Sequence, residues 1–441
     1  MSGTNAQDIS ETFNKGMKNL TNAGKDMFDQ VGSLLNKSPE EQTVEIIIFI
    51  IIALIVLIFI VWAANISTLN QRDCARLDNL YSTTKVANPI SIRESGNSSV
   101  YIANNLFFKG SHATVNAYYV KTAYNCCSPG DMKNSFVELC ALKKCIQLGA
   151  RCLDFEIYSE NGKPVVATSI VDSNLVDSYY IKQTFNSIDL ADVLYTIYYY
   201  AFDNHEGGAP NFSDPLFIHM RIMTDESKTI DLIAKYLGEI MSDKLLGIEY
   251  GNANYGESMA PLNLLQFSNK CIVMVYKNRL SDMNTQTIKN SKLYPLINIL
   301  TNTDEFKLFR NSQLSSEDNS DIVTHNKYYM SMVLPDLSPS SSNYNPTKAF
   351  QSGCQFIGMH FQNFDTNLEY YFELFDELRY AYILKECSMR NFPTHYLVDE
   401  VPAGSQGTAC ATEQNMALGG ASINLTIPPY NPVSQNSANT D

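Results

Sequence analysis

Basic residues are scarce in this 441-residue sequence, which contains 32 Lys and Arg against 46 Asp and Glu and has a formal net charge of -14. Such a surplus of negative charge repels the phosphate backbone of nucleic acids, so we expect no nucleic-acid partner. The same field argues mildly against spontaneous adhesion to anionic lipid. With 45% hydrophobic residues the composition is that of a globular chain with a sizeable core.

Tryptophan occurs only once, as Trp62, near the end of an uncharged apolar run of 19 residues at positions 46–64. At a rise of ~1.5 Å per residue the run spans about 28 Å, close to the ~30 Å thickness of a hydrocarbon core. A buried core helix is seldom apolar on every side, and a cleaved signal peptide would not carry 45 residues ahead of its apolar part. We therefore predict a single transmembrane helix over residues 44–64.

Metal-type Cys-x-x-Cys pairs are absent, although the sequence contains ten cysteines. Two of them, Cys126 and Cys127, are adjacent. Four others lie in apolar segments, where a free thiol behaves as a small hydrophobic side chain. These four are Cys140, Cys145, Cys152 and Cys271. We therefore expect reduced cysteines in a cytosolic domain rather than disulfides in an oxidising compartment.

The basic residues beside the apolar run favour a cytosolic C-terminal part only slightly under the positive-inside rule. They are Lys25 and Lys37 before the run and Arg72, Arg76 and Lys85 after it. Four Asn-x-Ser/Thr sequons, the acceptor sequences for N-glycosylation, keep the opposite orientation open. They begin at Asn65, Asn97, Asn211 and Asn424.

Polar segments surround the apolar run and close the chain. Residues 1–43 carry apolar side chains at three-, four- and seven-residue steps, which fits an amphipathic helix on a membrane or against a partner, or a loosely ordered tail. Residues 65–115 are rich in Asn and Ser and are predicted to form a stalk. Residues 396–441, rich in Ser, Asn, Pro and Gly, are predicted to form a flexible tail.

Strand-like and helix-like patterns alternate from about residue 117 onward. Apolar stretches such as RCLDFEIY, PLFIHMRIM and KCIVMVYK alternate with amphipathic stretches such as IDLADVLYTIYYYAF and SKTIDLIAKYLGEIM. This alternation predicts a mostly parallel sheet closed as a (β/α) barrel.

Several blocks of this region resemble the X and Y regions of eukaryotic-type phosphoinositide-specific phospholipase C. The X-like blocks are ALKKCIQLGARCLDFEIYSENGKPVV and KCIVMVYKNRL, and the Y-like blocks include IVTHNKYYMSMVLP, SSSNYNP, GCQFIGMHFQNFD and YAYILK. The resemblance implies a distorted (β/α)8 TIM-type barrel. Its X-like half would span residues 116–285, a linker residues 286–322, and the Y-like half residues 323–395.

The resemblance also implies which positions would carry catalysis. In the family, two histidines assist proton transfer and a calcium ion stabilises the developing charge. The first histidine, which ends a strand before an asparagine, is matched by Tyr124 of Tyr124-Asn125, and the second by Thr168. Both catalytic imidazoles are therefore predicted to be absent, unless His112 is the true first histidine or His219 is a substitute acid-base.

The calcium ligands of the family are matched only in part. Asn125 is kept, and Asp154 and Glu156 match a Glu-x-Asp pair with the two acids exchanged. Their i, i+2 spacing on a strand places both carboxylates on one face. Arg221 stands where the family has a further ligand carboxylate, so we expect its guanidinium to pair with Asp154 or Glu156 in a vestigial metal site.

The headgroup-binding positions are altered as well. Met332 and Leu334 stand where the family has an arginine and a tyrosine, whereas Lys277 matches a headgroup lysine and Arg279 conservatively replaces another. The block Asn-Tyr-Asn-Pro is retained. It adds Asn343 and Tyr344 to the candidate substrate-binding residues.

A barrel with a changed site predicts a membrane-anchored pseudoenzyme without a cofactor, which binds a lipid headgroup or a protein. Two alternatives remain open. One is an active phosphoinositide phosphodiesterase, with calcium or with a metal-free site in which Arg221 replaces the ion. The other is a structural protein of a viral membrane, favoured by the Asn-, Ile- and Tyr-rich composition.

Overall fold

The computed structural model describes residues 39–84, 86–92, 114–170, 181–251, 258–278, 282–314 and 318–391. Its two compact units divide after Thr68. In the first unit, α2 (Pro39–Ser67) extends the predicted transmembrane helix at both ends. Among the described residues, its Ile46–Ser67 stretch is the one that is long and apolar enough to cross a membrane. The predicted amphipathic segment lies largely in residues 1–38, outside the described part of the chain.

Eight parallel strands form the nearly closed barrel of the second unit, which confirms the predicted fold. Their hydrogen-bonded order is β7-β6-β5-β2-β1-β10-β9-β8. The bounds are β1 (Tyr118–Ala123), β2 (Cys152–Glu160), β5 (Leu216–Ile222), β6 (Cys271–Tyr276), β7 (Ile299–Thr301), β8 (Phe306–Arg310), β9 (Met330–Leu334) and β10 (Phe356–Met359). The two ends of this path, β7 and β8, are consecutive in the chain, so the barrel closes at the turn between them.

Three further strands extend the sheet through antiparallel pairs. They are β3 (Lys163–Ala167), β4 (Ile188–Asp189) and β11 (Tyr382–Leu384). β3 continues from β2 as a hairpin and pairs in turn with β4, whereas β11 pairs with β1. The hairpin therefore lengthens β2 beyond the barrel on the side where the site residues lie.

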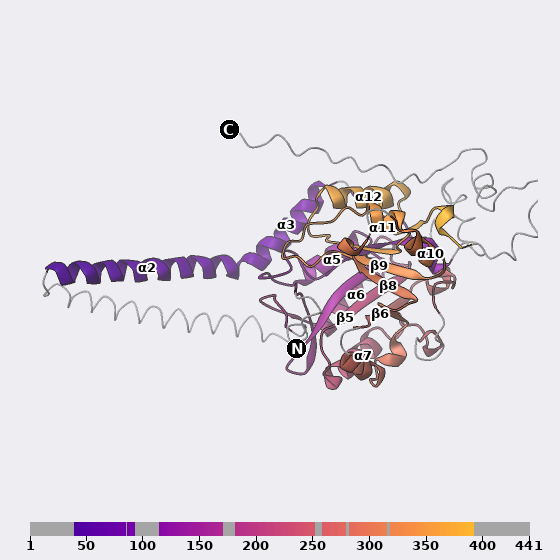
Figure 1. Ribbon diagram of the computed structural model, residues 1–441, viewed down its shortest axis with the longest axis horizontal. Coiled ribbons are helices and arrows are strands. Elements are labelled where there is room, and N and C mark those ends of the chain that lie inside the picture. Colours follow the sequence, from indigo (N-terminus) through magenta and orange to yellow (C-terminus); the bar gives the residue numbers. More distant parts are fainter. Residues whose placement is uncertain are drawn as a thin grey trace, which may run out of the picture. The chain divides into compact units, whose positions relative to one another are not determined.

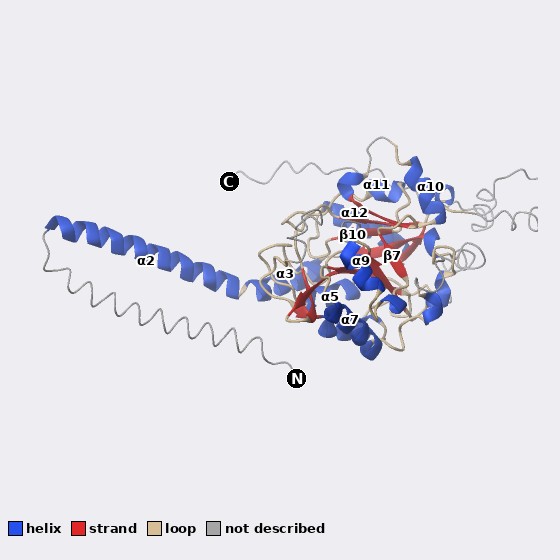
Figure 2. Ribbon diagram, turned by 60° about the horizontal axis from the view of Figure 1, so that its bottom comes forward, coloured by secondary structure: helices blue, strands red, loops and turns tan. Residues whose placement is uncertain are grey.

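Helices surround the strands, as Figures 1 and 2 show. Their bounds are α3 (Leu69–Thr83), α5 (Leu139–Gln147), α6 (Leu190–Ala201), α7 (Ser227–Ile240), α9 (Asp282–Lys289), α10 (Ser320–Tyr328), α11 (Thr347–Gln351) and α12 (Thr366–Leu378). Side-chain carboxylates cap α6 and α12, where Asp189 accepts from the Ala191 amide and Asp365 from the Leu368 amide. α12 ends at Arg379 in the left-handed conformation.

The barrel interior is apolar beneath the site. The rings of Phe217 and Phe306 both pack against Phe356, with centroids 5.0 and 5.7 Å apart. A separate and larger apolar cluster lies between the outer face of the sheet and the helices. The site residues therefore lie on a layer of packed apolar side chains, which excludes water from the barrel interior.

Part of the segment expected to be a linker belongs to the barrel. Residues 286–322 contain both β7 and β8, which are two of the eight barrel strands. These strands are only three and five residues long and are joined by a polar turn. Their apolar pattern is too short to stand out from the polar sequence around it.

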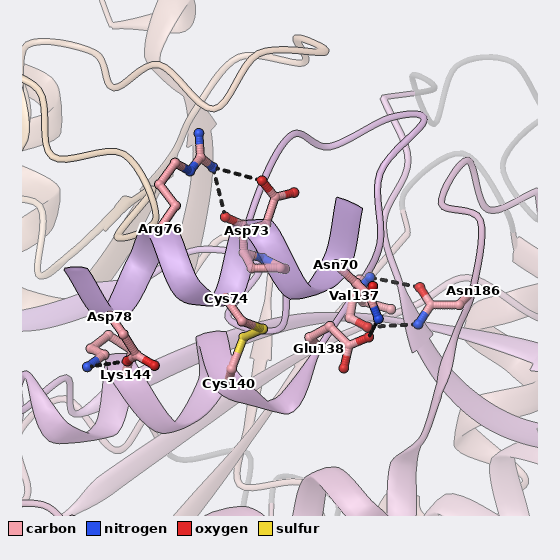
Figure 3. The surroundings of a disulfide bond; sticks show 11 residues. Asn70, Asp73, Cys74, Arg76, Asp78, Val137, Glu138, Cys140, Lys144 and Asn186 are labelled. Atoms are coloured by element: carbon pink, nitrogen blue, oxygen red, sulfur yellow. Dashed lines mark hydrogen bonds and ion pairs between the residues drawn. A yellow bond between two sulfur atoms is a disulfide. The ribbon is translucent and has the colours of Figure 1, made fainter. Parts of the chain in front are cut away.

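The segment expected to be a stalk begins with a helix that packs on the barrel. α3 lies against α5, and Cys74 forms a disulfide with Cys140 (Figure 3). The expectation that Cys140 is a free thiol is therefore wrong. Cys140 is partly exposed on the outer side of α5, so it is not one of the buried thiols that its apolar segment suggested.

Candidate functional site

The candidate site lies inside the barrel at the carboxyl ends of its strands. On β2 the inward side chains are Asp154 and Glu156, and on the neighbouring β5 they are His219 and Arg221. The register pairs Asp154 with His219 and Glu156 with Arg221. Because both pairs follow the i, i+2 alternation of a strand, all four side chains share the inner face. Tyr124 and Asn125 follow directly after β1.

Arg221 connects both acids and the asparagine. Its Nε and Nη2 donate to Asp154 Oδ1 at 3.0 Å and Oδ2 at 2.6 Å, a bidentate pair. Its Nη1 donates to Glu156 Oε1 at 2.7 Å, and its Nη2 also donates to Asn125 Oδ1 at 2.7 Å. The guanidinium thus occupies the point on which all three candidate calcium ligands converge. The ion pair expected from the sequence is present with both acids.

Every oxygen of the two carboxylates accepts two hydrogen bonds. On Asp154, the Asn125 backbone N–H adds to Oδ2 at 3.2 Å and His219 Nδ1 adds to Oδ1 at 2.7 Å. On Glu156, Oε1 also accepts from Asn125 Nδ2 at 3.4 Å. Its Oε2 accepts from the Tyr158 hydroxyl at 2.7 Å and from the Ser169 amide at 2.8 Å. Both acids are therefore saturated by protein donors.

The residues present do not fit a calcium ion. Calcium requires six to eight oxygen ligands, mostly from carboxylates and carbonyls. Here the carboxylate oxygens are taken, and a fixed cation stands between them. Among the described residues there is also no group of three or more His, Cys, Asp or Glu side chains that could hold a metal ion.

Asp154 and Arg221 hold each other in the charged form although both are buried. Burial alone would raise the pKa of Asp154, but the Arg221 guanidinium and the His219 hydrogen bond hold that pKa far below its usual range. Burial would lower the pKa of Arg221, yet the nearby Asp154 charge raises it well above its ordinary value. The ion pair is therefore fully charged at neutral pH.

His219 is held as a neutral bridge. Burial lowers its pKa, against the opposing effect of Asp154. A neutral ring that donates from Nδ1 to Asp154 must accept at Nε2, where the Thr301 hydroxyl lies 2.9 Å away. Both ring nitrogens are thus engaged, and the side chain is fully buried.

Sequence reasoning missed two residues of the site, His360 and Arg310. The His360 ring meets the Tyr124 ring edge-on at 5.1 Å, and burial lowers its pKa to about 3. Arg310, at the end of β8, donates from Nη1 to the Tyr124 hydroxyl at 3.4 Å and to the Pro335 carbonyl at 2.8 Å. An imidazole therefore lies beside Tyr124, although it comes from the end of β10 and not from either position where the family has a catalytic histidine.

A signal for His360 was present in the sequence, whereas none stood out for Arg310. His360 directly follows the apolar strand residues of β10, as Tyr124 follows those of β1. In a parallel barrel, residues at the carboxyl ends of different strands converge. Arg310 was overlooked because β8 fell within the expected linker.

The remaining candidate residues make structural contacts. The Thr168 hydroxyl donates to the Met132 carbonyl at 2.7 Å. Asn343 bonds to both sides of His360, since its Oδ1 accepts from the His360 amide at 2.6 Å and its Nδ2 donates to the His360 carbonyl at 3.1 Å. The Tyr344 hydroxyl donates to the Val333 carbonyl at 3.3 Å, on β9. These contacts fix the loop behind His360.

Lys277 lies just beyond β6, and its backbone amide donates to the Thr301 carbonyl at 3.0 Å. Its side chain is half-buried. Arg279 and His112 lie outside the described residues. The structure therefore does not place the alternative first histidine.

Apolar side chains complete the filling of the barrel mouth. Met332 and Leu334 are fully buried in the interior cluster, together with Tyr124. Gly358 permits this close packing, because a Cβ there would lie 2.9 Å from Leu334 Cδ2 and 3.5 Å from Tyr124 Cβ. Tyr124 and Arg221 are each only 3% exposed, with the guanidinium carbon 4.7 Å from the ring centroid. The candidate site is thus closed to solvent.

Comparisons with known proteins agree with this architecture. Residues 272–388 match the sequence model of the phosphatidylinositol-specific phospholipase C Y domain. The 1-phosphatidylinositol 4,5-bisphosphate phosphodiesterase delta-4 of Xenopus laevis is 28% identical over 123 residues, which are 27% of this chain and 16% of that protein. Crystal structures of PLC21 from L. pealei and from S. officinalis superpose with a TM-score of 0.51 at 18% and 19% identity. Each alignment covers 64% of this chain and 38% of the squid or cuttlefish protein.

The fold matches the TIM-type barrel of phospholipase C, and residues 272–388 match its Y domain. More specifically, the resemblance to the eukaryotic type of phosphoinositide-specific phospholipase C is confirmed. The chain matches only 16% and 38% of the length of these relatives, so the likeness concerns the barrel and not their further parts.

Proposed function

We propose that this chain is a membrane-anchored phospholipase C-like barrel that no longer hydrolyses phosphodiesters and acts as a binding or structural module for a lipid headgroup or a protein. The observation that carries this proposal is the position of Arg221, which saturates Asp154 and Glu156 from the inside of the barrel. Membrane anchoring rests on α2, whose apolar stretch has the length of a span.

Loss of hydrolysis follows from what the reaction would require. A general base must reach the attacking hydroxyl, and a cation must face the phosphate oxygens. His219 and His360 are both buried and neutral, and His219 is engaged at both ring nitrogens. Four of the five N–H groups of Arg221 donate to Asp154, Glu156 and Asn125, so the guanidinium is directed at the chain's own side chains rather than at a substrate phosphate.

A metal-free phosphodiesterase is the second candidate, favoured by the pairing of His360 with Tyr124 beside two arginines. That reaction would require the mouth to open, because Tyr124 and His360 are each almost fully buried. Opening would expose Arg310 and His360 as a cation and a base. The structural role in a viral membrane rests on composition alone.

Hydrolysis of phosphatidylinositol and its phosphorylated forms by the full chain in detergent micelles tests the proposal. We expect no release of inositol phosphate, either with calcium or with a chelator. Release that requires calcium would contradict the proposal. Release without calcium that H360Q abolishes would establish the metal-free enzyme instead.

The binding role needs its own measurement. Titration of soluble inositol phosphates into the full chain distinguishes a headgroup receptor from a protein-binding module. A headgroup receptor would give saturable binding without hydrolysis. Absence of binding, together with absence of hydrolysis, would favour a protein partner. The variant K277A is the matched test of a headgroup site, since Lys277 is half-buried just beyond β6.

A further inference from the structure

Two features of the chain bear on the compartment in which it folds, and they point in different directions. One is the disulfide between Cys74 on α3 and Cys140 on α5, with 66 residues between them in sequence. The other is Asn211, which begins an Asn-x-Ser sequon yet is 0% exposed. A disulfide requires an oxidising environment, and an occupied sequon requires a surface position.

Native contacts hold the two cysteines together from both sides (Figure 3). Asp78 forms an ion pair with Lys144 at 2.8 Å, and the Asn70 side chain donates to Glu138 at 3.0 Å. In Figure 3 these two contacts lie on either side of the disulfide, along the same pair of helices. These contacts between α3 and α5 do not involve the sulfur atoms, so they favour the approach of Cys74 to Cys140 independently of the bond.

Accessibility singles out the same two cysteines. Cys74 and Cys140 are partly exposed, whereas the six free cysteines among the described residues are all buried. Burial raises the pKa of the Cys126, Cys127 and Cys152 thiols, which suppresses their reactive thiolate form. An oxidant can therefore reach Cys74 and Cys140 more readily than any of these six buried thiols.

Asn211 is a structural residue that cannot carry a glycan in the folded barrel. Its Oδ1 accepts from Arg151 Nη2 at 3.0 Å. Its Nδ2, the atom that a glycan would occupy, lies 3.3 Å from both the Gly149 carbonyl and Asp214 Oδ2. Arg151 is itself fully buried, so a displaced Asn211 would leave a buried cation short of an acceptor. A chain glycosylated here before folding could not reach this structure.

We infer that Cys74 and Cys140 are joined by a thiol–disulfide oxidoreductase in a compartment that does not perform N-glycosylation. The partner is a carrier protein with an oxidised dithiol pair. One thiolate of the chain attacks the carrier disulfide to give a mixed disulfide, and the second thiolate then displaces the carrier. The chain loses two electrons and two protons, and the carrier leaves as a dithiol. This inference is independent of whether the barrel hydrolyses phosphodiesters.

A peptide map of the full chain, isolated from the cells that make it, tests both the disulfide and the absence of a glycan on Asn211. Free thiols are alkylated before digestion, so that only the cysteines in disulfide bonds remain unalkylated. We expect the Cys74 and Cys140 peptides to be linked until a reductant is added, and the Asn211 peptide to be unmodified. Alkylated Cys74 and Cys140 would overturn the inference, and so would a glycan on Asn211.

A second experiment directs the full chain into the secretory lumen of eukaryotic cells by means of an added leader. We expect the unchanged chain to be glycosylated at Asn211 and to lack a protease-resistant barrel. The S213A variant, which removes the sequon and loses only the 2.8 Å contact with the Ser91 hydroxyl, should fold and form the disulfide. An inhibitor of glycan synthesis should rescue the unchanged chain in the same way, without any substitution.

E206T is the matched control, because it creates a sequon at the exposed Asn204 and so reports entry into the lumen. A folded barrel that carries a glycan on Asn211 would overturn the inference. An unmodified Asn211 in chains that are glycosylated at Asn204 would also overturn it, because the sequon would then say nothing about the compartment.

Discussion

Arg221 and Asp154 form a bidentate ion pair inside the barrel, with N–O distances of 3.0 and 2.6 Å. The two residues lie diagonally across the adjacent strands β2 and β5, since the register partner of Arg221 is Glu156, and neither is more than 3% exposed. Arg221 compensates the charge of Asp154 and also donates to Glu156, so a cation of the chain itself stands where a metal ion would otherwise bind.

Removal of the guanidinium should destabilise the barrel strongly. In R221Q, Asp154 and Glu156 would remain buried without a countercharge, which costs about 3–5 kcal/mol. Denaturant unfolding of the full chain measures this difference. The control is K235Q, which breaks the exposed Lys235–Glu239 pair at 3.8 Å and should change stability by less than about 1 kcal/mol. Equal effects of the two variants would contradict the account.

Restoration of a carboxylate at position 221 should create calcium dependence. R221E would place a third carboxylate beside Asp154 and Glu156, a ligand set that suits calcium and is unstable without it. We expect the unfolding temperature of R221E to rise when calcium is added, with about 2.7 kcal/mol gained at a hundredfold excess over Kd. R221Q, which adds no carboxylate, should respond far less. A calcium response in the unchanged chain would count against the account.

Acidification should destabilise the barrel through its buried histidines. Burial lowers the pKa of His360 to about 3, against an ordinary value of 6.5. Between these two pH values His360 is protonated in the unfolded chain but not in the folded chain. The free energy of unfolding is therefore highest above pH ~6.5 and falls as the pH drops toward ~3. The lowered pKa of His219 acts in the same direction.

The variant H360Q isolates this contribution. Urea midpoints at neutral and mildly acidic pH should differ less for H360Q than for the unchanged chain. An equally steep loss of stability in the variant would show that His360 is not responsible. Asp154 adds to the acid sensitivity only at still lower pH, because its pKa is depressed and its pairing is lost last.

The disulfide should contribute substantially to stability. It closes a loop over a sequence separation of 66 residues. The chain-entropy model assigns about 4 kcal/mol to a loop of this size. Unfolding of C74S/C140S, compared with the unchanged chain with and without reductant, measures the contribution. Reductant should abolish the difference between the two, and a difference that persists would place the effect elsewhere.

Local patterns in the sequence predicted the centre of the site but not its rim. Asp154, Glu156 and Arg221 were placed correctly on the inner face, because strand alternation fixes the direction of each side chain. His360 and Arg310 depend on which strands are neighbours in the closed barrel, and single-strand patterns do not contain that information. The β8 strand that carries Arg310 is too short to be recognised as one.

The disulfide was unpredictable for a similar reason. Cys74 and Cys140 are brought together by the docking of α3 on α5, which depends on side-chain contacts such as Asp78–Lys144. The apolar contacts of α3, through Leu77 and Tyr81, are few in a polar segment that resembled a stalk. The fold itself was predictable, because long apolar strands alternating with amphipathic helices specify a barrel regardless of these details.

Calorimetric titration of calcium into the full chain at neutral pH tests the central claim most directly. We predict no specific binding, because both carboxylates are saturated by protein donors and Arg221 occupies the point of convergence. Stoichiometric binding of calcium to the unchanged chain, lost in D154N, would contradict the account.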